Sequence, residues 1–93
     1  MLTSHSKATP HPEVVCTSLP NGEVVLLHLA TKTYYSLNET GSRIWRQLGQ
    51  GLTMGQISRD LESGFDVTPE TARQSVLDLA GDLLTEKLVL LQE

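Results

Sequence analysis

The sequence predicts an α+β domain in which a three-stranded antiparallel sheet is followed by three helices. Two observations predict this order. Three short runs rich in β-branched, apolar or aromatic residues come first, and turn residues separate them. Three longer stretches with apolar residues at helical spacing follow, each preceded by a capping residue. The chain has 93 residues, which suffices for one domain with a modest core.

The three strands are expected at residues 14–18, 23–29 and 33–37. Pro20, Asn21 and Gly22 separate the first two, and Asn and Gly tolerate the positive φ of a tight turn. The second run is apolar on both faces, which is typical of a central strand. The third is rich in β-branched and aromatic residues and is expected at an edge. A final short strand is expected near residues 89–91.

The three helices are predicted from their caps. Asn38 is expected to cap the first helix, and Thr53 with Gln56 forms the pattern of a capping box at the second. Thr68 followed by Pro69 starts the third helix, which is expected to end near residue 86. The apolar positions of the first helix, which are expected in the core, are Ile44, Trp45 and Leu48.

The third helix carries a wide apolar arc. One narrow sector is expected to face the core, and Leu77 and Leu84 lie about 100° away from it, with Ala80 between the two sectors. Two explanations stay open: the helix is buried from two directions within its own domain, or the second sector lines a groove for a partner. The residues of the first sector are Ala72, Val76, Leu79 and Leu83.

Residues 1–12 are expected to form a disordered arm, and residues 13–93 the folded domain. Ser, Thr, His and Pro dominate the arm, which lacks the apolar stretch of a secretory signal. We therefore expect a cytoplasmic protein, and the apolar runs are too short for a membrane span. His5 and His11 have no neighbouring ligands and Cys16 is the single cysteine, so no metal and no cofactor are expected.

Catalysis and nucleic-acid binding are both disfavoured. Cys16, His28 and Ser36 lack a third group that would orient a nucleophile and its base, so the chain is not expected to be an enzyme. The element order suggests a winged helix-turn-helix, a fold in which the third helix often enters the DNA major groove. Residues 68–88 carry four acidic and two basic side chains, and the whole chain has a net charge of −4. A transcription regulator therefore stays only as an alternative.

Several motifs in order carry a resemblance to a known family. The segment YYSLNETG at residues 34–41, then Ile44 and Trp45, residues 53–57, and FDVTPETARQSVLDL at residues 65–79 resemble PqqD-like proteins over about residues 14–91. The resemblance implies a recognition element that binds the leader of a ribosomally made precursor peptide. It would present that leader to a leader peptidase and other modifying enzymes, with lasso peptide biosynthesis favoured. A carrier for a radical-SAM maturation system is the alternative within the family.

The resemblance also implies where the leader docks: as an added strand beside residues 33–37, against the third helix. An edge strand has unpaired backbone groups, so the location agrees with elementary physics. Lys32 and Arg73 are expected to pair with acidic groups of the peptide at the rim. A structural or dimerising module that uses the same edge is a further alternative. The expected peptide-binding residues are Lys32, Thr33, Tyr34, Tyr35, Ser36, Leu37, Arg73, Leu77, Ala80 and Leu84.

Overall fold

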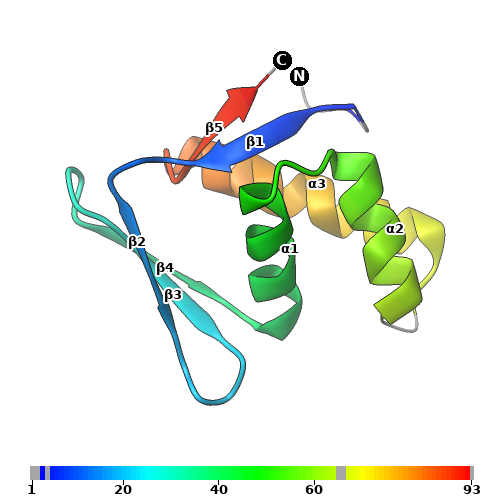
Figure 1. The fold of residues 1–93 in the computed structure, drawn as a ribbon, viewed down its shortest axis with the longest axis horizontal. Helices are drawn as coiled ribbons and strands as arrows, with labels where there is room; N and C mark the ends of the chain where they lie inside the picture. Colours follow the sequence, from blue (N-terminus) through cyan, green and yellow to red (C-terminus); the bar gives the residue numbers. More distant parts are fainter. Residues whose placement is uncertain (1–2, 4, 65–66, 93) are drawn as a thin grey trace.

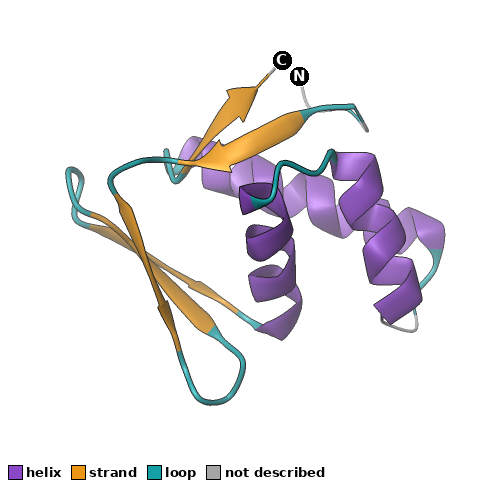
Figure 2. Cartoon of the chain, viewed as in Figure 1, coloured by secondary structure: helices purple, strands orange, loops and turns teal. Residues whose placement is uncertain are grey.

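The computed structural model describes all residues except 1, 2, 4, 65, 66 and 93. Its elements confirm the expected α+β class, with a sheet followed by three helices (Figures 1 and 2). Within the described residues they are, in chain order, β1 (Lys7–Pro10), β2 (Val14–Ser18), β3 (Val24–His28), β4 (Thr33–Leu37), α1 (Glu39–Gly49), α2 (Met54–Gly64), α3 (Pro69–Thr85) and β5 (Val89–Gln92).

The three-stranded sheet has the order β2-β3-β4, and both pairings are antiparallel. The expected central strand and the expected edge strands are thus confirmed. Val24, Leu26 and His28 of β3 are buried, whereas Val25 and Leu27 on the opposite face are only half-buried. One face of the sheet therefore packs on the core, and the other face lacks a covering layer.

The expectation of a disordered arm is wrong for residues 7–10, which form β1. This strand pairs antiparallel with β5, with Lys7 opposite Gln92 and Pro10 opposite Val89. Ala8 is fully buried, and the amide of Met54 donates to the carbonyl of Ser6 at 2.9 Å. The polar composition concealed the strand because its partner lies at the other end of the chain. Residues 1, 2 and 4 of the expected arm lie outside the described residues.

The helix caps are as expected. The side chain of Asn38 accepts the amide hydrogen of Gly41 at 2.8 Å, and Thr68 accepts that of Thr71 at 3.2 Å. Thr53 and Gln56 exchange reciprocal side-chain-to-backbone bonds at the start of α2, which is the predicted capping box. These bonds satisfy backbone groups that the first turn of each helix leaves free.

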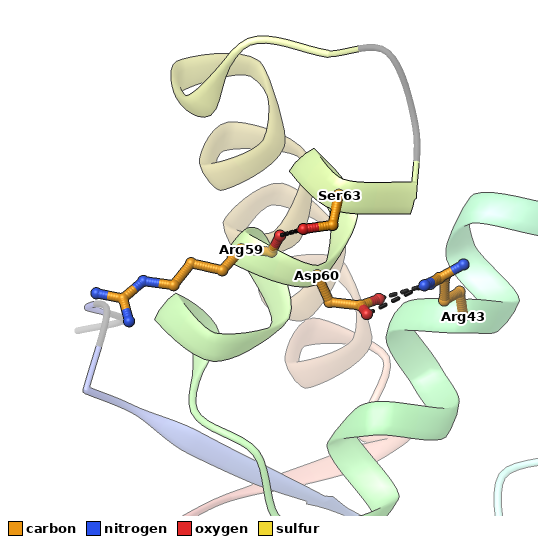
Figure 3. A network of polar contacts seen from close by, with 4 residues as sticks. All are labelled: Arg43, Arg59, Asp60 and Ser63. Carbon is orange, nitrogen blue, oxygen red and sulfur yellow. Dashed lines mark hydrogen bonds and ion pairs between the residues drawn. The ribbon is translucent and has the colours of Figure 1, made fainter.

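An ion pair joins α1 to α2. The Arg43 guanidinium of α1 binds the Asp60 carboxylate of α2 through Nε and Nη2, the latter 3.0 Å from Oδ1 (Figure 3). This bidentate bond holds the pKa of the Asp60 carboxyl below its usual range. One turn further, the Ser63 hydroxyl donates to the carbonyl of Arg59 at 3.3 Å (Figure 3). The Arg43–Asp60 pair therefore holds the two helices together at their surface.

The core lies between the inner face of the three-stranded sheet, the β1–β5 ribbon and the three helices. Trp45 is buried, as are Ile44 and Leu48, so the predicted stripe of α1 is confirmed. No helix among the described residues is long and apolar enough to cross a membrane. The other fully buried large side chains are Leu26, Met54, Ile57, Leu61, Val76, Leu83, Leu88 and Val89.

Candidate functional site

The outer edge of β4 offers unpaired backbone groups. The amide of Leu29 donates to the carbonyl of Glu13, and that of Leu19 donates to Glu23. Bonding direction alternates along an antiparallel strand, so Val24, Leu26 and His28 direct their backbone groups toward β4. Their partners on β4 are Leu37, Tyr35 and Thr33. The intervening residues, Tyr34 and Ser36, consequently direct their N–H and C=O groups away from the sheet, into the open edge.

A groove of about 410 Å³ runs beside this edge, between β4 and α3. One wall is β4, one end is the start of α1, and the opposite wall is α3. The groove therefore has an exposed strand edge along its length. Its lining residues are Tyr35, Ser36, Leu37, Asn38, Thr40, Gly41, Ile44, Ser75, Asp78, Leu79 and Asp82.

The lining is apolar at its base and acidic on its helical wall. Leu37 and Ile44 are almost fully buried and Leu79 is half-buried, so they form an apolar floor. Asp78 and Asp82 lie on the α3 wall. An extended peptide would thus meet apolar surface and negative charge in the same groove.

Tyr35 connects the two walls. Its hydroxyl donates to Oδ2 of Asp82 at 3.4 Å, across 47 residues of sequence. Burial raises the pKa of the Tyr35 phenol above its usual value, and the neighbouring Asp82 carboxylate raises it further. The phenol therefore stays protonated at neutral pH and remains a hydrogen-bond donor to Asp82.

The strand residues expected from the sequence lie at or near this groove. Tyr35, Ser36 and Leu37 line it, whereas Tyr34 projects from the outer face of the sheet with 70% of its surface exposed. Thr33 begins β4, and the exposed Lys32 lies in the preceding turn with a φ of 62°. Of the expected strand residues, three therefore line the groove and the others lie beside it on β4 or in the preceding turn.

The helix residues expected from the sequence lie elsewhere. Ala80 has no exposed surface, so it is a core residue and a peptide cannot touch it in this structure. Leu84 lines a different hollow with His11 and His28, whose rings lie 4.5 Å apart. Arg73 and Leu77 do not line the β4–α3 groove. The four expected helix residues therefore do not line this groove, which borders a different side of α3.

Four groove residues of α3 were missed: Ser75, Asp78, Leu79 and Asp82. Sequence reasoning took the second apolar sector, with Leu77 and Leu84, as the partner side, but Ala80 belongs to the core and the groove side is mixed. Leu79 was assigned to the core, and in the structure it is half-buried and lines the groove. The sequence did contain a sign of this arrangement, because Leu79 is four residues after Ser75 and three before Asp82. This spacing places all three residues on one face of the helix.

Among the described residues, no group of three or more His, Cys, Asp or Glu side chains is placed to hold a metal ion. The sequence-based expectation that the chain needs neither metal nor cofactor stays a prediction.

Comparison with known proteins finds a matching family and two solved structures with a similar fold. Residues 23–89 match the family described as "Coenzyme PQQ synthesis protein D (PqqD)". A solved structure described as "TbiB1 in Complex with the TbiA(beta) Leader Peptide" is 32% identical, with a TM-score of 0.81, over 87% of this chain and 93% of that one. Another, "Lasso peptide synthetase B1 complexed with the leader peptide", is 24% identical with a TM-score of 0.83, over 90% and 98% of the two chains. No curated protein sequence matches significantly.

Proposed function

The chain belongs to the PqqD family, and from that premise we propose that it binds the leader segment of a ribosomally synthesised precursor peptide. The leader adds to the sheet as a fourth strand beside β4. The observation that carries the proposal is the open edge at Tyr34 and Ser36 with a groove directly beside it. Backbone bonding to the edge gives affinity, and side-chain contacts in the groove give selectivity.

The role that fits this site is that of an adaptor. The described residues that line the groove form an apolar floor and place two carboxylates on the α3 wall, which suits holding an extended peptide. The adaptor presents the leader to a leader peptidase and other modifying enzymes in the cytoplasm. The acidic α3 wall also disfavours the alternative of a DNA-reading third helix.

Lasso peptide biosynthesis is the pathway we favour. One of the solved structures with this fold is described as a lasso peptide synthetase B1 complexed with the leader peptide. The relative that shares 32% identity was solved with a leader peptide bound, which supports the same class of ligand here.

The decisive experiment is amide hydrogen exchange followed by NMR. The probes are synthetic leader segments of candidate precursor peptides, which are to be sought among the short reading frames near this gene. The backbone carbonyls of a bound leader accept hydrogen bonds from the outward N–H groups of β4. The amide hydrogens of Tyr34 and Ser36 should therefore exchange at least about tenfold more slowly. The outward amides of the opposite edge, at Cys16 and Ser18 of β2, should be unchanged.

Two results would contradict the proposal. The first is that none of the candidate leaders binds the folded protein. The second is a leader that binds but protects Cys16 and Ser18 while leaving Tyr34 and Ser36 exchanging freely. The β2 amides serve as the internal control, because both edges belong to one sheet and respond alike to a general gain in stability.

A further inference from the structure

A strand added beside β4 would aim every second side chain at α3. Successive side chains of a strand alternate between the two faces of a sheet. On β4, Tyr35 and Leu37 face inward with Leu26 and Val24, whereas Tyr34 and Ser36 face outward. Inward side chains of the added strand would share the face of Tyr35 and Leu37, and α3 forms the wall that they meet.

The spacing of the α3 wall matches that of such a strand. Inward positions of a strand recur about every 6.6 Å, and four residues of a helix rise about 6 Å. Ser75 and Leu79, four residues apart, match this period, and Asp82, three residues further along the helix, follows after about 4.5 Å. The wall follows the strand, because Tyr35 binds Asp82 at one end, and Thr40, close after β4, lines one hollow with Ser75 at the other.

The carboxylates of this wall have only neutral partners. Asp82 accepts from the Tyr35 hydroxyl, and Asp78 accepts from Nε2 of Gln74 at 2.7 Å. In the described part of the chain, neither carboxylate forms an ion pair with a lysine or arginine. The Glu86 carboxylate, which follows α3, also raises the pKa of the Tyr35 phenol. The groove thus holds two carboxylates that lack a cation.

We infer that the peptide taken by this groove carries a lysine or arginine facing Asp78 and Asp82, with an apolar side chain two residues away on Leu37, Ile44 and Leu79. The inference rests on the proposed function and specifies its ligand. The inferred peptide charge is opposite to the charge expected from the sequence. Lys32 and Arg73 suggested an acidic peptide, but Arg73 does not line the groove, and the charges that do are negative.

The test selects peptides for binding and then asks which charged residues the selected peptides carry. A display library of random 16-residue peptides is selected against the unmodified protein, against Asp82→Lys and against Glu70→Lys. Glu70 is an exposed residue in the first turn of α3 and does not line the groove, and both variants carry the same net charge. Binding of selected peptides is then measured by fluorescence polarisation, with Ser36→Pro as the variant that blocks the strand edge.

The unmodified protein and Glu70→Lys should enrich a basic residue two positions from an apolar one. Asp82→Lys should lose that enrichment and favour Asp or Glu at the same position. Changing the basic residue of the best peptide to glutamine should weaken binding about two- to fivefold, because both carboxylates are exposed.

The outcomes separate the inference from the function it rests on. One outcome is that the selected peptides lose binding to Ser36→Pro, and so need the β4 edge, but show no preference for a basic residue. That outcome would overturn the inference and leave the proposed function standing. An identical basic preference in Asp82→Lys would also overturn it. If no peptide is selected, or if the selected peptides bind Ser36→Pro unchanged, the proposed function itself fails.

Discussion

The same sheet has two open edges, and they differ in what lies beside them. At β4 the edge faces α3 across a groove with an apolar floor and two carboxylates. At β2 the edge borders a hollow of about 340 Å³ lined by Cys16, Trp45 and Arg46, among others, and none of the described carboxylates lines it. Both edges offer backbone hydrogen bonds, so backbone alone does not define the site. The helix wall beside each edge determines which peptide would bind there.

The largest expected effect tests which side of α3 forms the wall. Leu79→Asn should weaken peptide binding about ten- to thirtyfold, because it removes an apolar contact from the groove floor. Leu77→Asn is the matched control, since Leu77 is also half-buried but does not line the groove. It should change binding less than about threefold. The measurement is fluorescence polarisation, with circular dichroism to establish that both variants are folded. A larger loss in Leu77→Asn would return the site to the side expected from the sequence.

A smaller effect compares the two edges directly. Ser36→Pro deletes an outward N–H of β4, and Ser18→Pro deletes the equivalent group of β2. Neither donor takes part in the bonding between strands, so both variants should fold. Binding should fall about three- to tenfold in Ser36→Pro, in keeping with one lost ladder bond, and stay within about twofold in Ser18→Pro. Titration of one labelled peptide against both proteins measures the difference. The opposite ranking would assign the peptide to the β2 edge.

The smallest effect concerns Lys32, in the turn before β4. It is exposed and outside the groove lining, so Lys32→Ala should leave the equilibrium affinity within about threefold. Its charge acts at a distance, and the association rate and its salt dependence should change more than the dissociation rate. Stopped-flow measurements at two salt concentrations provide the check. A dissociation rate that rises tenfold would mean that Lys32 contacts the bound peptide.

Local sequence features predicted the elements whose signals are local. The caps at Asn38, Thr53 and Thr68 fix the helix starts, and the turn at Asn21 and Gly22 fixes the first hairpin. The strand β1 escaped prediction because it exists only through pairing with β5, and its polar composition gives no sign of that partner.

The helix wall of the site escaped prediction for a different reason. A helical wheel shows which residues share a face, but not which face turns toward which neighbour. Leu77 and Leu84 are apolar and lie outside the sector expected to face the core, so they were assigned to the partner side. The tertiary packing instead places Ala80 in the core and turns Leu79 with its acidic neighbours toward β4. The strand half was predictable because an edge position follows from the order of the strands.

The β1–β5 ribbon makes this domain suited to topological rearrangement. Lys7 and Gln92 are opposite each other in its register, so the two ends of the described chain lie side by side (Figure 1). A short glycine-serine linker would join them, and new ends could be opened in the exposed turn at Asn21 and Gly22, far in sequence from the groove residues of α3. The same adjacency would let the whole domain be inserted as a cassette into a surface loop of an enzyme, with both connections leaving from one place and the β4 edge still free.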